Sequence, residues 1–241
     1  MGMGALERLE KSRAAKAVMA VAVFCLIFGG WTAFQHYRDA SAGLPDAPPR
    51  AEGCALWFIG SSSIRRWTSL ERDMAPWVTY NRGIDDTGFG EIVPRFANVR
   101  GEARPAAIIL YAGENDIARD VPVRKVVRNL AAFLELRRQI MGDVPVLVLS
   151  MKPSPGRWTH FPAQQLYNAA AQRLLPRMRQ AYYVDITSPL LTNGRTGDNY
   201  RPDGVHMNPA GYHIWARVVR QRLGEALPAG VVKRCDPGTP F

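Results

Sequence analysis

Short apolar segments alternate with longer segments of helical periodicity through most of this 241-residue chain. Five apolar runs predict strands, at residues 55–59 (ALWFI), 78–81, 106–111 (AAIILY), 144–150 (VPVLVLS) and 182–186. Apolar positions spaced by three or four residues predict helices, at residues 64–74, 88–99 (interrupted at Pro94), 123–140, 162–179 and 209–227. Continuous apolar strands are typical of parallel sheets buried on both faces. The pattern therefore predicts an α/β domain with a five-stranded parallel sheet between two layers of helices.

The amino-terminal part of the chain follows a different pattern. Residues 17–34 (AVMAVAVFCLIFGGWTAF) carry no charge, and their number is at the lower end of what spans a ~30 Å hydrocarbon core. The basic residues before this stretch are Arg8, Lys11, Arg13 and Lys16. Because positive charge stays on the cytosolic side, we expect a cytosolic tail at residues 1–16 and a transmembrane helix at 17–35.

A cleaved signal segment is the alternative to this anchor, with Ala40-Ser41-Ala42 as a loose cleavage site. Either way the remainder of the chain is expected outside the cytoplasm, anchored on the periplasmic face or exported. Residues 36–53 are rich in Pro, Gly and Ala and predict a linker. The folded domain is then expected at residues 54–241.

Cysteine usage agrees with export. Cys54 and Cys235 lie at the two ends of the predicted domain, and Cys25 lies in the apolar stretch. In an oxidising compartment the first two would form a disulfide, although two unrelated thiols are the alternative. The chain has no CxxC motif, which argues against cysteine-based zinc or redox sites.

Composition and charge exclude several classes of protein. A chain with 47% hydrophobic and 22% charged residues is neither disordered nor collagen-like, and its length suits one main domain. The net charge of +10 comes from 31 Lys+Arg against 21 Asp+Glu. This excess is dispersed as single residues and accompanies no nucleic-acid-binding motif, so we expect no nucleic-acid partner. We also expect a monomer.

Polar clusters follow the predicted strands. The clusters are Gly60-Ser61-Ser62-Ser63 after the first, Asn81-Arg82-Gly83 after the second, Gly113-Glu114-Asn115-Asp116 after the third, and Asp203-Gly204-Val205-His206 beyond the fifth. Ligands of parallel sheets bind beyond the carboxyl ends of the strands. We therefore expect the four clusters to converge at one edge of the sheet.

These clusters contain the groups that acyl transfer requires. A hydroxyl needs a neighbouring base, for which neutral imidazole is suited, and a carboxylate must orient that imidazole. Among the four histidines, His206 alone has a carboxylate three residues before it and a helix start after it. His36 lies beside the apolar stretch, His160 in a loop and His213 inside the last predicted helix.

The four clusters together resemble the conserved blocks of the SGNH/GDSL hydrolases over about residues 54–227. The segment from Phe58 to Ile64 is similar to the opening block, with Ser61 where that family has Asp and Ser62 at the nucleophile position. Gly83 matches the glycine of the second block, Asn115 the asparagine of the third, and Asp203 with His206 the last block. The resemblance implies a three-layer, flavodoxin-like fold.

The serine-rich opening is most similar to the branch that resembles platelet-activating-factor acetylhydrolases, and residues 150–158 are similar to bacterial esterases of that branch. The resemblance implies hydrolysis of short-chain carboxylic esters through Ser62, His206 and Asp203. The N–H groups of Ser62 and Gly83 and the Asn115 amide would form the oxyanion hole. No metal or organic cofactor is expected.

Other functions remain open on the sequence alone. An O-acyltransferase acting on envelope glycans would use the same residues. A non-catalytic glycan- or lipid-binding module and a metal hydrolase using Asp203, His206 and Asp116 are further alternatives. The expected substrate is a small acyl ester, a lipid or an acetylated glycan, and the membrane is the other expected partner, through the amino-terminal segment.

Several other side chains lie in or near the clusters and have expected roles of their own. Asp116 is expected to brace its loop by accepting backbone N–H groups. Ser63 is a candidate helix N-cap, and Ser61 a candidate hydrogen-bond donor. Three residues after the fourth predicted strand either contact substrate or brace their own loop, namely Lys152, Arg157 and His160.

Overall fold

The computed structural model describes residues 16–32, 42–48, 53–236 and 238. The chain forms two compact units, residues 1–42 and 43–241, and each is described by itself. The predicted cytosolic tail, apart from Lys16, lies outside the described residues, as does most of the predicted linker.

The larger unit is built on a five-stranded sheet. Its strands are β1 (Ala55–Gly60), β2 (Val78–Gly83), β3 (Ala107–Tyr111), β4 (Val146–Leu149) and β5 (Ala181–Val184). They are ordered β2-β1-β3-β4-β5 and every pairing is parallel. This order confirms the predicted α/β fold. The order in which strands are added to the sheet reverses between β1 and β3, and sheets of this kind bind ligands at such a point.

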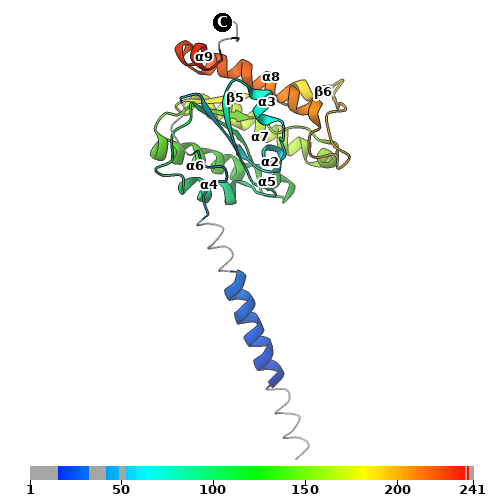
Figure 1. The fold of residues 1–241 in the computed structure, drawn as a ribbon. Coiled ribbons are helices and arrows are strands. Elements are labelled where there is room, and N and C mark those ends of the chain that lie inside the picture. The colour runs from blue at the N-terminus through cyan, green and yellow to red at the C-terminus, as the bar shows by residue number, and fades with distance from the viewer. Residues whose placement is uncertain (1–15, 33–41, 49–52, 237, 239–241) are drawn as a thin grey trace, which may run out of the picture. The chain divides into compact units, whose positions relative to one another are not determined.

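Helices cover both faces of the sheet (Figure 1). One face carries α2 (Ser62–Arg65), α3 (Leu70–Met74), α8 (Pro209–Ala226) and α9 (Ala229–Cys235). The other carries α4 (Phe89–Ala97), α6 (Val123–Met141) and α7 (Phe161–Leu174). The short elements are α5 (Glu114–Ala118), the 3-10 helices η1 (Pro155–His160), η2 (Leu175–Arg177) and η3 (Ser188–Leu190), and the antiparallel pair β6 (Leu191–Thr192) and β7 (Arg195–Thr196).

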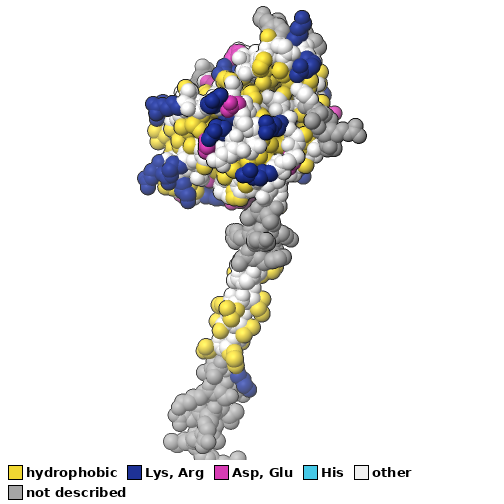
Figure 2. Space-filling model, turned by 90° about the vertical axis from the view of Figure 1, so that its left-hand side faces the viewer, with side chains coloured by type: hydrophobic (Ala, Val, Ile, Leu, Met, Phe, Trp, Pro, Cys, Tyr) yellow, Lys and Arg dark blue, Asp and Glu magenta, His cyan; other side chains and the backbone are white. Residues whose placement is uncertain are grey.

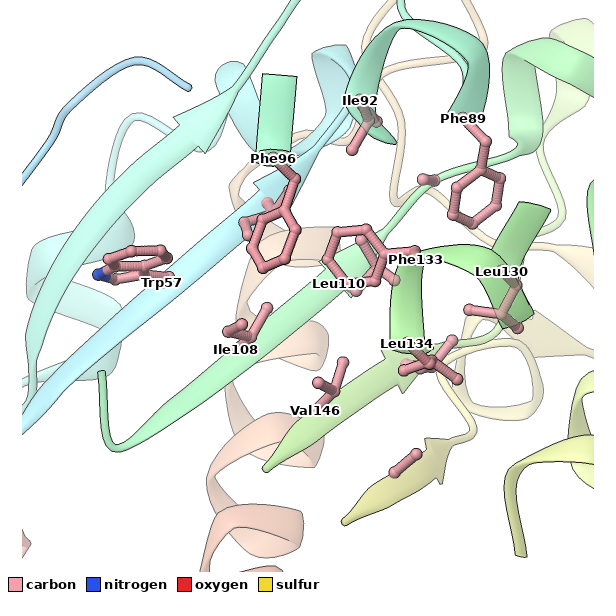
Figure 3. Packing of buried hydrophobic residues seen from close by; sticks show 14 of the residues in the cluster. Trp57, Phe89, Ile92, Phe96, Ile108, Leu110, Leu130, Phe133, Leu134 and Val146 are labelled. Carbon is pink, nitrogen blue, oxygen red and sulfur yellow. The ribbon is translucent and has the colours of Figure 1, made fainter. Parts of the chain in front are cut away.

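Strands β1, β3 and β4 are apolar and buried along their whole length because helices cover both of their faces. In β1, Leu56 and Phe58 belong to the core under α8, whereas Trp57 and Ile59 belong to the core under α4 and α6. Figure 3 shows the second of these cores, where Phe96 and Phe133 pack with their ring centroids 4.6 Å apart. The two apolar layers hold the strand ends in a fixed register.

The structure differs from the predicted elements where side-chain hydrogen bonds compete with the backbone. The helix predicted at 64–74 is two short helices, α2 and α3, with Trp67 buried between them. Asp73 Oδ2 accepts both the Trp67 indole N–H at 2.9 Å and the Ser69 hydroxyl at 2.5 Å, which stabilises the break. Pro94 lies within α4 without ending it, because Ile92 and Phe96 on either side are buried in the core.

Part of the predicted linker belongs to the folded unit. Leu44 is buried, and the Asp46 carboxylate accepts the backbone N–H of Asn81 at 2.8 Å. The buried Arg82 guanidinium donates to the carbonyls of Pro45 and Leu44 and pairs with Glu102 at 2.7 Å. This segment therefore covers the edge strand β2, which otherwise has unpaired backbone groups.

The amino-terminal unit contains a helix over residues 16–32. Its large apolar side chains, such as Phe24 and Leu26, are exposed (Figure 2). Among the residues that the structure describes, no helix is both long and apolar enough to cross a membrane. The transmembrane helix predicted at 17–35 is thus not supported, and its last three residues lie outside the described part.

On the face of the folded unit in Figure 2, Lys and Arg side chains are spread among uncharged ones.

A disulfide joins Cys54 to Cys235, whose Cα atoms are 5.3 Å apart. Cys54 immediately precedes β1 and Cys235 ends α9, so the bond closes a separation of 181 positions. Cys235 is buried in the core beneath α8. The bond therefore ties the last helix of the chain to the start of the central sheet.

Breaking this disulfide is expected to lower the free energy of unfolding. Cross-linking so long a loop lowers the entropy of the unfolded chain, which raises the free energy of unfolding by about 5 kcal/mol at most. We expect the thermal midpoint of the protein to fall on adding reductant and in the variant Cys54→Ser, as measured by differential scanning calorimetry. Cys25→Ser is the control, because Cys25 is a free, exposed thiol. Equal midpoints with and without reductant would contradict this role.

Candidate active site

The structure brings Ser62, His206 and Asp203 together at the carboxyl edge of the sheet. Ser62 is the first residue of α2 and is separated from the end of β1 only by Ser61, and the other two lie in the loop before α8. The Ser62 hydroxyl Oγ is 2.9 Å from His206 Nε2, across 144 sequence positions. His206 Nδ1 is in turn 2.7 Å from Asp203 Oδ2. A hydroxyl, an imidazole and a carboxylate thus form one hydrogen-bonded series.

Asp203 is held by its own turn. Its second oxygen, Oδ1, accepts the backbone N–H groups of Val205 and His206, both at 2.8 Å. Partial burial raises the pKa of the Asp203 carboxyl, but these two bonds and the bond from the His206 ring outweigh it. The pKa of Asp203 therefore lies well below its ordinary value, and the side chain is an anion at neutral pH.

The loop that carries His206 is fixed from both sides. Before it, the Arg201 N–H donates to the His206 carbonyl at 2.7 Å. After it, Asn208 caps α8 by accepting the Gly211 N–H at 3.1 Å, with Pro209 in the first turn. The Tyr212 hydroxyl of α8 donates to the Ser63 carbonyl at 2.9 Å. The helix after the histidine is therefore bonded to the helix that begins with Ser62.

The structure separates the three adjacent serines. Ser61 and Ser63 are buried, and Ser62, which is partly exposed, bonds the imidazole. Ser63, predicted as a candidate N-cap, is instead inside the helix, because α2 begins at Ser62. Gly60 before the triplet has a packing role, since a Cβ there would be 2.1 Å from the Tyr111 carbonyl oxygen.

The three predicted oxyanion donors lie at the ends of β1, β2 and β3. The Ser62 N–H is in the first turn of α2, where helices lack internal acceptors. The Asn115 amide is buried and uses one N–H on the Thr87 carbonyl at 2.9 Å, which leaves its second N–H for another acceptor. The Gly83 N–H is engaged by the Asn81 side chain at 3.2 Å, so an incoming oxyanion must replace that acceptor.

Gly83 also sets how closely β2 approaches α2. A Cβ at this position would be 2.3 Å from the Arg65 backbone nitrogen and 2.9 Å from the Ile64 carbonyl carbon. A larger residue would therefore push the helix that carries Ser62 away from the strand. The sequence signal for this contact is a glycine at the end of a strand, because only a residue without a side chain allows so close an approach.

Asp116 braces its loop, as expected. Its Oδ2 accepts the Phe89 N–H at 2.9 Å at the start of α4, and the Gly88 backbone packs directly against the carboxylate. Burial raises the pKa of Asp116, although the Phe89 N–H partly offsets the effect. Within the described ranges no three His, Cys, Asp or Glu side chains are grouped as metal ligands.

The three candidate residues that follow β4 in the sequence lie in different surroundings. Lys152 is fully buried, with Nζ 2.9 Å from both Glu114 carboxylate oxygens, so it braces the interior and is not placed to contact substrate. Arg157 is 3.3 Å from Glu114 and partly exposed. His160 is also partly exposed, 3.3 Å from the Thr159 hydroxyl.

Sequence reasoning missed two contacts of the site. Arg66 Nη1 lies 3.3 Å from His206 Nδ1, and Arg66 Nε pairs with Asp85 Oδ1 at 3.2 Å. The second contact is that of the buried Glu114 carboxylate with Lys152 and Arg157. Neither contact leaves a local pattern, because each partner comes from a distant segment.

A hollow of about 530 Å³ lies between η1 and the β6–β7 pair. It is lined by Pro155, Trp158 and residues 193–196. The N–H of Gly156 on η1 donates to the Gly204 carbonyl at 2.8 Å, so one wall of the hollow belongs to a segment that is bonded to the turn containing Asp203.

The fold and the side chains at its sheet edge define an α/β protein with a hydroxyl–imidazole–carboxylate site. Residues 51–214 match the sequence model of the GDSL-like lipase/acylhydrolase family. The chain belongs to this family, and it is therefore an ester hydrolase by class. This confirms the resemblance that the sequence blocks indicated. No curated protein matches the chain.

Solved structures share the fold at low identity. One, from Streptococcus pneumonia and provisionally described as a platelet activating factor, is 23% identical, with a TM-score of 0.64, covering 87% of this chain and 99% of its own. A GDSL-like lipase from Bacteroides thetaiotaomicron is 21% identical, with a TM-score of 0.58 and coverage of 80% and 96%. An acetyl-xylooligosaccharide esterase from Geobacillus is 15% identical, with a TM-score of 0.57 and coverage of 72% and 95%.

Proposed function

We propose that this chain hydrolyses short-chain carboxylic esters through an acyl-enzyme on Ser62. The observation that carries this proposal is the unbroken series from the Ser62 hydroxyl through His206 to Asp203, with distances of 2.9 and 2.7 Å. The family match supports the reaction class. The relatives described as esterases support an acyl ester as substrate.

In the proposed mechanism, Ser62 Oγ attacks the ester carbonyl carbon while His206 Nε2 takes the hydroxyl proton. Asp203 keeps Nδ1 protonated and stabilises the imidazolium that forms. The Ser62 and Gly83 N–H groups and the Asn115 amide stabilise the oxyanion of the tetrahedral intermediate. His206 then gives its proton to the leaving alcohol. A water molecule, activated by the same imidazole, releases the acid from Ser62.

A fluorophosphonate probe is expected to label Ser62, because the probe reacts with serines activated by a neighbouring base. Mapping of the modified peptide by mass spectrometry checks the position. The label should disappear in Ser62→Ala and fall strongly in His206→Ala, together with hydrolysis of p-nitrophenyl acetate.

Ser61→Ala and Ser63→Ala are matched controls for this labelling. Both hydroxyls are within one residue of Ser62 and are buried. We expect each variant to keep the label on Ser62. Label on Ser61 or Ser63 in the parent protein would refute the assignment of the nucleophile.

In the acid limb of its pH profile, kcat/KM is expected to depend on the protonation of a single group. Only neutral imidazole accepts a proton from Ser62, so activity falls as His206 is protonated. The groups facing that ring are Asp203 and Arg66, the latter paired with Asp85. Because the pKa of Asp203 is well below its ordinary value, Asp203 stays ionised above about pH 4 and adds no second proton. A log kcat/KM slope of two over this limb would contradict the assignment.

We also infer that the amino-terminal segment holds the enzyme at a membrane with the folded unit outside the cytoplasm. The uncharged stretch at 17–34, the basic residues before it, and the disulfide in the folded unit support this proposal. We expect the full chain in the membrane fraction and a chain lacking residues 1–42 in the soluble fraction. Recovery of the full chain in the soluble cytoplasmic fraction would contradict this proposal.

A further inference from the structure

A buried ion pair lies beside the candidate active site. The side chains of Glu114 and Lys152 are 2% and 0% exposed, and Lys152 Nζ is 2.9 Å from each Glu114 oxygen. The Tyr111 hydroxyl donates to the same carboxylate at 2.5 Å. Burial raises the pKa of Glu114, but the charges of Lys152 and Arg157 outweigh it, so the pKa lies below its ordinary value. Glu114 is therefore an anion in the interior.

Stability alone does not account for this pair. Removing two charges from water costs about as much as their attraction returns, and apolar residues of similar volume often serve a core as well. A buried carboxylate that accepts hydrogen bonds from several donors instead fixes the direction from which each donor approaches. The partners of Glu114 come from β3, from the segment after β4 and from η1.

One of these partners connects the interior with the site. Arg157 Nη1 on η1 is 3.3 Å from Glu114 Oε1, and its side chain is 22% exposed. Lys152 stands at the beginning of the same segment, directly after β4. Glu114 thus holds both ends of residues 152–157 against the carboxyl edge of the sheet.

This segment is bonded in turn to the loop of the histidine. The Gly156 N–H donates to the Gly204 carbonyl at 2.8 Å, and the Tyr200 hydroxyl donates to the Pro153 carbonyl. The packing is tight, because a Cβ on Gly156 would be 3.0 Å from the Asp203 carbonyl oxygen. A displacement of residues 152–157 therefore moves the turn that carries Asp203 and His206.

We propose that Glu114 is a positioning residue, which holds the Asp203–His206 turn at bonding distance from Ser62 through Arg157 and the segment after β4. This inference rests on the proposed ester hydrolysis. Glu114 also precedes Asn115, the proposed oxyanion donor. One buried carboxylate thus sets the position of the acid–base turn relative to an oxyanion donor.

Arg157→Met tests the link without disturbing the Glu114–Lys152 pair. We expect kcat for p-nitrophenyl acetate to fall about tenfold or more with KM within twofold, because small displacements of reacting groups are costly. We also expect the acid limb of kcat/KM to move to lower pH by about half a unit, since a looser Asp203 stabilises the imidazolium less. Arg157→Lys keeps the charge near Glu114 and should recover most of the loss.

The matched control is Arg138→Met, which removes an exposed ion pair with Glu135 on α6, and should leave kcat and the acid limb unchanged. A purely structural role of Arg157 would lower the thermal midpoint and leave the acid limb in place, which overturns the proposal. A rise in KM with unchanged kcat would overturn it too, because Arg157 would then contact substrate. Absence of fluorophosphonate label on Ser62 in the parent protein would instead refute the proposed function.

Glu114→Gln supplies a second test, with folding checked by circular dichroism. This variant leaves the Lys152 charge without its partner. If the variant fails to fold, the Arg157 variants alone decide the test. In a folded Glu114→Gln protein, adding Arg157→Met should slow kcat less than twofold further, because both changes break the same link. Fully independent losses would overturn the proposal.

Discussion

The hydrogen bond between the Ser62 hydroxyl and the His206 imidazole is the contact on which the rest of the site depends. Its atoms are 2.9 Å apart and their residues 144 positions apart, so no local structure can hold them. The parallel sheet solves half of this problem, since β1 delivers Ser62 to its carboxyl edge. The loop before α8 solves the other half, and Tyr212 bonds α8 back to α2.

Close backbone approach is the second constraint on this edge. Gly60 and Gly83 end adjacent strands, and each lies so near a neighbour that a Cβ would overlap backbone atoms. The absence of side chains lets β2, β3 and α2 meet around Ser62. The two backbone donors proposed for the oxyanion, the N–H groups of Ser62 and Gly83, belong to α2 and β2, which this close packing brings together.

Three carboxylates hold the loops at the same edge of the sheet. Asp116 caps α4, Glu114 binds Lys152 and Arg157, and Asp203 accepts two backbone N–H groups of its own turn. Asp116 and Glu114 accept from buried donors that would otherwise lack partners, which is costly, whereas Asp203 is exposed and orders the backbone of its own turn. Together they fix the loops after β3, β4 and β5, whose lengths alone would allow many conformations.

The sequence by itself determined the order of strands and helices, because apolar runs and helical spacing are local, and the family blocks marked Ser62, Asn115, Asp203 and His206. It could not separate Lys152 as a buried partner from Lys152 as a substrate contact, nor exclude that Cys54 and Cys235 were free thiols. Only the tertiary structure decided these points, together with the break between α2 and α3 and the packing of Leu44 on the sheet. Each depends on contacts between distant segments, and such contacts leave no periodic trace along the chain.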